Sequence, residues 1–397
     1  MTSIGKNFCI APFTQITFGP NGGYSPCPEI GGRPWKEETV DIVKMWNSTE
    51  FNALRNSFLN NEKNKICDRC WGQEDNGNPS LRKRLLTNSP TRRFNKGELL
   101  PFVETKHKDG PRQINIMVGN ICNLRCRICR GGISFTYKPE GKYYKEKYNV
   151  SNIYEFTRKK PLVLSSEHID QIFNFSKNLE RIEFYGGEPL LDVPTLSLLE
   201  RLVESGQSKN ITLFYNTNCM VTPSERQYQL WNQFEAIEFN FSIDDIGKRF
   251  TYNRHPGVWE EALEHINAIR SHNWSIPTKF LAICTVSNLN IFYMPELLTT
   301  VEELGLPYFL NNVHGPAYYD ITFLPLAVKK PIIEKLKTFK DVLKIEFLIN
   351  MLSAPENLGH WEDFKFWVRA KDEYRKEDFA ETYPEFYNIC KEADPTF

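Results

Sequence analysis

Short apolar runs alternate with amphipathic stretches from about residue 113 onward, and this alternation restricts the fold more than any other feature. The predicted strands are 114–118, 181–186, 211–216, 236–243, 279–286 and 308–313. The predicted helices are 165–175, 193–205, 223–233, 258–271 and 293–305. Such a series forms a parallel sheet with right-handed crossovers, either doubly wound or curved into a barrel. In both cases ligands lie at the carboxyl ends of the strands.

Composition indicates a globular protein of more than one unit. The 397 residues exceed the roughly 250 to 300 that one core organises. Because 49 Lys and Arg balance 49 Asp and Glu, no overall field attracts nucleic acid or a membrane surface, and neither partner is expected. No signal peptide and no apolar run of about 18 residues is evident. We therefore expect a cytoplasmic protein whose ten cysteines serve metal or redox chemistry.

Changes in pattern predict four regions. Residues 1–95 carry glycine-rich turns and two cysteine groups, which indicates a loop-rich, metal-stapled domain. Residues 96–112 form the end of a basic linker, since 82–112 hold nine Lys or Arg against three Asp or Glu. Residues 113–326 contain the βα series, and 327–397 form a helical tail with helix starts at Pro331 and Pro384. The basic stretch is either a solvated connector or a surface for RNA, a phosphorylated substrate or an acidic electron donor.

Three cysteines, Cys122, Cys126 and Cys129, directly follow the first predicted strand. They therefore lie in the first βα loop, at the end of the sheet where active sites form. Three thiolates on an iron–sulfur cube leave one iron free for a small chelating ligand. The alternative is a structural zinc loop that takes a distant fourth ligand.

A second motif, Gly186, Gly187, Glu188 and Pro189, ends the next strand. Paired glycines allow close approach of the backbone to a ligand, and a carboxylate can hold an ammonium group. By itself this motif is a weak signal. The CxxxCxxC and GGEP motifs together resemble the radical S-adenosylmethionine (radical SAM) superfamily over about residues 112–315. The resemblance implies an α/β fold, a partial (β/α)6 TIM-like barrel.

The resemblance also implies roles for individual residues. Cys122, Cys126 and Cys129 would be the catalytic centre and would hold a [4Fe–4S] cluster whose open iron binds the amino and carboxylate groups of SAM. The glycine-rich motif would contact the amino group. The remaining SAM contacts implied in this way are Asn218, Ser242, Asp244, Arg254 and Ile128, the last standing where the family usually has an aromatic residue. The alternative for Asn218, Ser242, Asp244 and Arg254 is that they only satisfy backbone groups at strand ends.

Four further cysteines, Cys9, Cys27, Cys67 and Cys70, precede the barrel and make a complete ligand set. Their spacing resembles the auxiliary-cluster region of SPASM/twitch radical SAM enzymes, where it commonly follows the barrel. The resemblance implies a twitch-like domain with an auxiliary [4Fe–4S] cluster, and zinc is the alternative. In WGQEDNGNPSLRKR, Glu74, Ser80 and Arg82 are implied to support this site or to contact substrate.

These expectations describe a radical SAM enzyme that cleaves SAM reductively to a 5′-deoxyadenosyl radical, with an auxiliary cluster assisting. The expected substrate is a peptide or a small polar metabolite, and the expected electron donor is a flavodoxin or ferredoxin-type protein. A different class of function stays open, a non-catalytic zinc-binding protein that presents a basic surface to RNA or a protein partner. The sequence does not identify the substrate, the oligomeric state or the fate of SAM.

Overall fold

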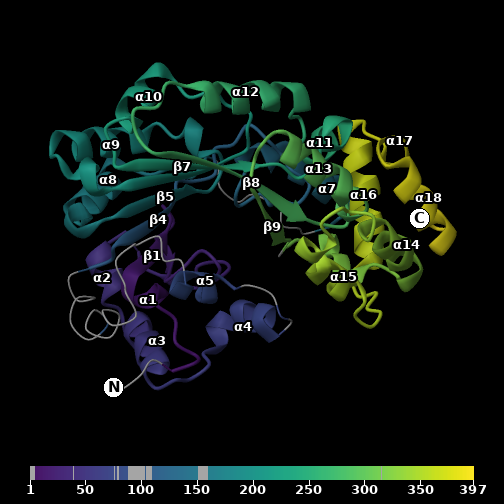
Figure 1. The fold of residues 1–397 in the computed structure, drawn as a ribbon, viewed down its shortest axis with the longest axis horizontal. Coiled ribbons are helices and arrows are strands. Elements are labelled where there is room, and N and C mark those ends of the chain that lie inside the picture. The colour runs from purple at the N-terminus through teal and green to yellow at the C-terminus, as the bar shows by residue number, and fades with distance from the viewer. Residues whose placement is uncertain are drawn as a thin grey trace.

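The computed structural model describes residues 5–397 apart from 39, 76, 78–79, 88–102, 104–109, 151–159 and 314. One sheet of nine strands organises the molecule, in the order β3-β2-β1-β4-β5-β6-β7-β8-β9 (Figure 1). The strands are β1 (Gln15–Phe18), β2 (Gly23–Ser25), β3 (Trp35–Lys36), β4 (Gln113–Met117), β5 (Arg181–Tyr185), β6 (Thr212–Thr217), β7 (Ala236–Ser242), β8 (Thr278–Val286) and β9 (Tyr308–Asn312). Strands β1 and β4 to β9 pair in parallel, so the predicted α/β fold with a partial barrel is confirmed.

All six predicted strands of the βα series occur, within two residues of their predicted ends. Their alternating pattern explains the layers. In β4, Ile114 and Ile116 are fully buried against the helices, while Gln113 lines the opposite, concave face. Because successive side chains of a strand point to opposite faces, an apolar outer face and a polar inner face follow from one sequence.

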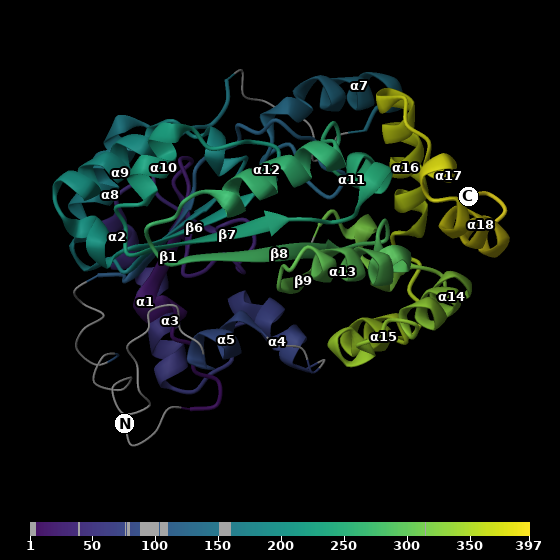
Figure 2. The ribbon, with the colours of Figure 1, turned by 45° about the horizontal axis from the view of Figure 1, so that its top comes forward.

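The predicted helices cover the outer face of the sheet (Figure 2). They are α8 (Ser166–Asn174), α9 (Pro194–Glu204), α10 (Glu225–Trp231), α12 (Trp259–Ser271) and α13 (Met294–Glu303). Ser165 and Ser224 cap α8 and α10 through side-chain bonds to the third helical residue. Two further helices, α7 (Lys138–Tyr148) and α11 (Gly247–Asn253), interrupt the simple alternation.

The N-terminal region is more regular than the sequence indicates. It contains α1 (Ala11–Thr14), α2 (Ile42–Trp46), α3 (Thr49–Leu59), α4 (Asp68–Asp75) and α5 (Leu81–Thr87). Its strand β1 pairs in parallel with β4, so the sheet of the barrel begins before the predicted domain boundary. Helices α4 and α5 lie under the concave face of the sheet (Figure 2). Most of the predicted linker 96–112 lies outside the described residues.

The C-terminal tail is helical, as predicted, and lies beyond the carboxyl ends of the strands (Figure 2). Its helices are α14 (Leu326–Leu336), α15 (Glu346–Leu352), α16 (Trp361–Arg375), α17 (Phe379–Thr382) and α18 (Pro384–Ala393). The predicted helix start at Pro384 is right, but the one at Pro331 is wrong. Pro331 lies inside α14, which begins five residues earlier at Leu326. Among the described residues, no helix is long and apolar enough to cross a membrane.

Candidate active site

The loop after β4 carries Cys122, Cys126 and Cys129, each partly buried. A tight turn brings the last two together, since the Cys129 N–H donates to the Cys126 carbonyl at 2.8 Å. The Cys122 sulfur accepts from the Leu124 N–H at 3.4 Å and from the Asn218 side-chain amide at 3.6 Å. Arg254 Nη1 lies 4.0 Å from the Cys126 sulfur. Donors therefore face thiols that would carry negative charge on a metal cluster.

Burial and mutual repulsion govern the protonation of these thiols. Burial, together with the nearby Cys126, raises the pKa of Cys122 above its usual range and that of Cys129 to about 12. Burial also raises the pKa of Cys126, while Arg254 and Arg375 act in the opposite direction. Three close thiols become thiolates together only when cations neutralise them. This donor set fits an iron–sulfur cluster bound by three cysteines.

The GGEP loop crosses the start of the cysteine loop at close range. The Gly187 N–H donates to the Gly119 carbonyl at 3.0 Å, and the Glu188 N–H donates to the Ile121 carbonyl at 2.8 Å. A side chain at Gly187 would lie 1.9 Å from the Ile121 oxygen, and Gly186 has φ +119°. These glycines admit the backbone of the other loop, and their predicted contact with a ligand stays a prediction.

Glu188 is fully buried and ties the GGEP loop to the end of β6. Its carboxylate accepts from the Leu190 N–H at 3.1 Å and from the Asn218 N–H at 2.7 Å. Burial raises the pKa of Glu188 to about 7 despite these bonds. The adjacent Pro189 is buried and begins a short 3₁₀ helix. Asn218 thus contacts both Glu188 and Cys122, which brings three predicted site residues together.

Asp244 and Arg254 pair with each other, Oδ2 to Nη2 at 2.7 Å, and both are buried. Asp244 also accepts from the Thr285 N–H at 2.8 Å. Arg254 Nε is buried without a hydrogen-bond partner, so it keeps a donor for a ligand. Ser242 ends β7 and is partly buried. Ile128 packs against the hydrophobic core.

Helix α16 holds the cysteine loop, a feature that sequence reasoning missed. Arg127 is fully buried and forms ion pairs with Asp372 and, at 2.5 Å, with Glu377. Lys371 Nζ donates to the Arg127 carbonyl at 2.9 Å, and Arg375 Nη2 donates to the Arg125 carbonyl at 2.8 Å. These partners lie about 245 residues apart in sequence, and no local pattern marks them.

The four N-terminal cysteines, Cys9, Cys27, Cys67 and Cys70, line one small cavity of about 20 Å³. Burial raises the pKa of each, and neighbouring thiols raise those of Cys9, Cys27 and Cys67 further. In the part of the chain that the structure describes, no group of three or more His, Cys, Asp or Glu side chains is placed to hold a single metal ion. A closed set of four thiols around one cavity fits a fully ligated cluster.

Glu74, Ser80 and Arg82 bond to one another beside this cavity. The Ser80 hydroxyl and Arg82 Nε donate to Glu74 Oε1 at 2.5 and 2.9 Å. Arg82 Nη1 also donates to the carbonyls of Lys6 and Phe8, at 3.0 and 2.8 Å. Arg82 therefore braces the segment that carries Cys9, in agreement with a supporting role.

A cavity of about 790 Å³ lies between the concave face of the sheet and the N-terminal region. Strand residues such as Gln113, Glu183 and Asn240 line one side. Glu29 and Arg69 line the other, and both also line the small cavity of the N-terminal cysteines. Tyr185, directly before the GGEP loop, lines the large cavity as well. The chamber therefore borders the N-terminal cysteine site and reaches the strand residue that precedes the GGEP loop.

Two family models match the chain. Residues 116–301 match the Radical SAM superfamily, and residues 9–71 match SPASM, an iron-sulfur cluster-binding domain. The expectations of a SAM-binding cluster and an auxiliary iron–sulfur cluster are confirmed, which sets aside zinc and the non-catalytic alternative. No curated protein matches the chain.

Solved structures of two proteins resemble it. One is anSMEcpe with bound AdoMet, at 16% identity and a TM-score of 0.41 over 59% of this chain and 60% of that one. The other is Streptococcus suis SuiB bound to precursor peptide SuiA, at 12% identity and a TM-score of 0.36 over 81% and 64%. The chain thus matches 60% of the length of this anSMEcpe chain, less than two thirds, and 64 to 71% of the length of SuiB.

Proposed function

The chain belongs to the radical SAM superfamily, with its SPASM iron–sulfur domain ahead of the barrel, and we propose that it cleaves SAM reductively to modify a peptide. The observation that carries the proposal is the three-thiol loop at the carboxyl end of β4, beside buried Glu188 and Arg254. When bound, the cluster supplies the electron that splits SAM into methionine and a 5′-deoxyadenosyl radical, which removes a substrate hydrogen.

Different residues are assigned to the cluster and to the separate groups of SAM. We assign cluster ligation to Cys122, Cys126 and Cys129 and contact with the SAM ammonium group to Glu188. Arg254 offers its free Nε to the SAM carboxylate, while Asp244 holds the guanidinium in place. Asn218 and Ser242 end neighbouring strands and are assigned to the sugar side of SAM, with Ile128 packed near the adenine.

The N-terminal cysteine site borders the chamber in which we place the substrate. Because Glu29 and Arg69 line both the N-terminal cysteine cavity and the barrel chamber, an auxiliary cluster on Cys9, Cys27, Cys67 and Cys70 would border the substrate. This placement suits a centre that accepts the electron left when a substrate radical is oxidised.

The continuity of the chamber with a neighbouring groove favours a peptide over a small metabolite. The chamber, at about 790 Å³, is near the upper end of small-molecule pockets, which run from about 300 to 1,000 Å³. It also shares lining residues with a further groove of about 620 Å³ along β9. A chain segment can fill such a continuous space.

We infer a cytoplasmic enzyme, since all ten cysteines are free thiols. The proposed electron donor is a flavodoxin or ferredoxin-type protein.

Metal analysis and product analysis test the proposal. After anaerobic reconstitution, about eight irons per chain are expected, falling to about four in Cys122→Ala/Cys126→Ala/Cys129→Ala. With reductant and SAM, the wild type should form 5′-deoxyadenosine and the triple variant should not. A wild type that holds iron but forms no 5′-deoxyadenosine would refute the activity.

A further inference from the structure

Strand β9 is the open edge of the sheet, with β8 on its other side. At the ends of the ladder, the Ala282 N–H donates to the Pro307 carbonyl at 2.8 Å and the Val313 N–H donates to the Val286 carbonyl at 3.0 Å. Since alternate residues of a parallel strand face its neighbour, the backbone groups of Tyr308, Leu310 and Asn312 face outward. Within the described residues, these outward N–H and C=O groups form no hydrogen bond.

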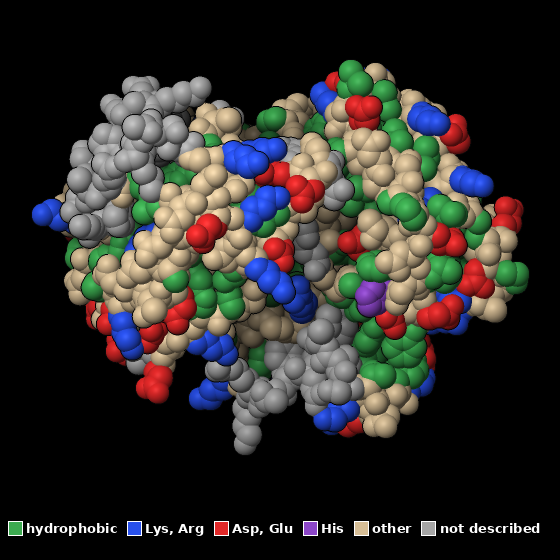
Figure 3. Space-filling view, turned by 90° about the horizontal axis from the view of Figure 1, so that it is seen from below, with side chains coloured by type: hydrophobic (Ala, Val, Ile, Leu, Met, Phe, Trp, Pro, Cys, Tyr) green, Lys and Arg blue, Asp and Glu red, His purple; other side chains and the backbone are tan. Residues whose placement is uncertain are grey.

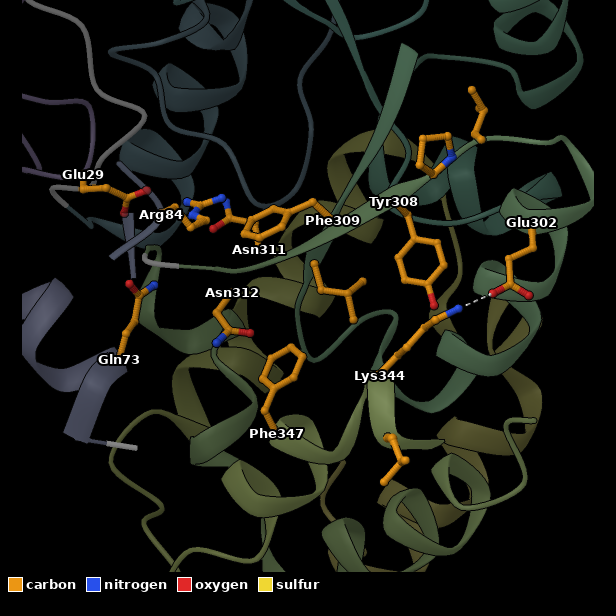
Figure 4. A pocket seen from close by; sticks show the side chains of 14 residues that line it. Glu29, Gln73, Arg84, Glu302, Tyr308, Phe309, Asn311, Asn312, Lys344 and Phe347 are labelled. Atoms are coloured by element: carbon orange, nitrogen blue, oxygen red, sulfur yellow. Dashed lines mark hydrogen bonds and ion pairs between the residues drawn. The ribbon is translucent and has the colours of Figure 1, made fainter. Parts of the chain in front are cut away.

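A groove of about 620 Å³ runs along this edge (Figure 4). Every residue from 306 to 312 lines it, so it follows the strand over its whole length. The opposite wall comes from Gln73 of α4, Leu343 and Lys344, and Phe347 of α15. Seen from below, the molecule is hollowed near its middle, with Lys and Arg side chains beside the hollow (Figure 3). The groove is therefore open along a strand edge rather than closed around a small ligand.

Polar atoms along the groove lack partners. Four of them, each shielded from solvent and without a hydrogen bond, are Gln73 Oε1, Arg84 Nε, Tyr308 Oη and Asn312 Oδ1. Phe309 packs under the Arg84 guanidinium at 4.4 Å, and both residues line the groove and the barrel chamber. Donors and acceptors alternating with apolar surface suit a peptide, whose backbone offers both kinds of group at every residue.

We propose that an extended segment of the substrate peptide binds as an added strand on the outer edge of β9. The backbone of the peptide pairs with Tyr308, Leu310 and Asn312, and its side chains contact Phe347 and Leu343 on the opposite wall. Six residues line both the groove and the barrel chamber, namely Glu29, Arg84, Pro307, Tyr308, Phe309 and Asn311. A segment anchored on β9 therefore leads into the chamber that borders the N-terminal cysteine site. The inference rests on the proposed action on a peptide.

The first test uses a displayed library of random dodecapeptides selected on the reconstituted wild-type protein. Leu310→Pro removes one outward N–H donor and places a ring on the edge, whereas the matched Leu310→Ala keeps the donor. Peptides enriched on the wild type should bind Leu310→Ala with similar affinity and Leu310→Pro about tenfold more weakly. Equal binding to all three, or no enrichment, would overturn the inference.

The second test leaves the protein unchanged, so it does not depend on how Leu310→Pro folds. An added strand pairs through alternate residues, and N-methylation at every second position therefore blocks one edge of a peptide. The two methylation phases are an enriched peptide methylated at its odd positions and the same peptide methylated at its even positions. One phase should abolish binding and the other should preserve it. Loss in both phases or in neither would contradict strand addition.

Failure of the proposed function can be distinguished from failure of the proposed docking mode. If the wild type forms no 5′-deoxyadenosine, the activity is wrong whatever the peptides do. If 5′-deoxyadenosine forms but both methylation phases bind equally, only the docking mode is wrong.

Discussion

Gly187 stands where two functional loops touch, and a side chain there would displace one of them. Its Cβ would lie 1.9 Å from the Ile121 carbonyl oxygen, which belongs to backbone that carries Cys122. Gly187→Ala should lower the free energy of unfolding of the apo-protein by about 2 kcal/mol. Because the displaced backbone leads into the cysteine loop, iron bound after reconstitution should also fall. Denaturant unfolding and iron analysis measure the two effects.

Gly132 provides the matched control. It lies just beyond Cys129, yet an added Cβ there would meet no atom within 4 Å. Gly132→Ala should therefore change stability and iron content little. If both alanine variants behave alike, the close crossing of the loops is not what Gly187 permits.

The raised pKa of Glu188 predicts that SAM binding depends on pH. Burial moves this pKa to about 7, and only the ionised carboxylate attracts an ammonium group. Lowering the pH through 7 protonates Glu188, so affinity for SAM should fall by about tenfold for each pH unit below the pKa. Calorimetric titration of the reconstituted protein with SAM at a series of pH values measures this.

Glu188→Gln removes the titrating group and keeps one acceptor oxygen, so one of the two bonds from the Leu190 and Asn218 N–H groups, which reach different carboxylate oxygens, is lost. Its affinity for SAM should be low at every pH and should lack the step near pH 7. A step that persists in this variant would assign the titration to another group.

At the scale of elements, α16 holds the cysteine loop through Arg127. Asp372 pairs with Arg127 and also accepts from the Tyr252 hydroxyl at 2.7 Å and the Phe379 N–H at 2.9 Å. Asp372→Ala leaves a buried guanidinium short of one partner, which should cost about 3 to 5 kcal/mol of unfolding free energy. Denaturant unfolding of the apo-protein measures the loss.

Glu362 is the control on the same helix. It pairs with Lys365 at 2.6 Å, but its side chain is 80% exposed. Glu362→Ala should cost less than about 1 kcal/mol, because Glu362 is exposed and the buried Lys365 keeps its ion pair with Asp394 at 2.6 Å. Equal losses in Glu362→Ala and Asp372→Ala would mean that the pairing with Arg127 does not stabilise the loop.

The strands and the two cysteine groups were predictable because their signals are local. Alternating polarity indicates the strands of the βα series, and cysteine spacing predicts the ligand sets. The hold of α16 on the loop carries no such signal, since Lys371 and Arg375 resemble any charged residues on a surface helix. The short strand β1 was also missed, because its four residues become a strand only by pairing with β4.

At the scale of the whole molecule, one sheet contains strands from the N-terminal region and from the barrel, which the sequence pattern assigns to separate domains. Strand β1 joins the N-terminal region to β4, which places the Cys9 site against the concave face of the sheet. The domain boundaries at residues 95, 112 and 326 stay a prediction. Because the two cysteine sites have separate predicted ligand sets, each site can be removed alone.

Removing the N-terminal site should therefore uncouple SAM cleavage from product formation. In Cys27→Ala/Cys67→Ala, iron should fall from about eight to about four per chain, and 5′-deoxyadenosine should still form in the presence of reductant. Oxidised product should disappear, because the electron of the substrate radical loses its acceptor. Cys390→Ala is the control, since Cys390 is a fully buried cysteine that lies in α18, outside both cavities. A double variant that keeps eight irons, or that still forms product, would show that the N-terminal cysteines take no part in the redox step.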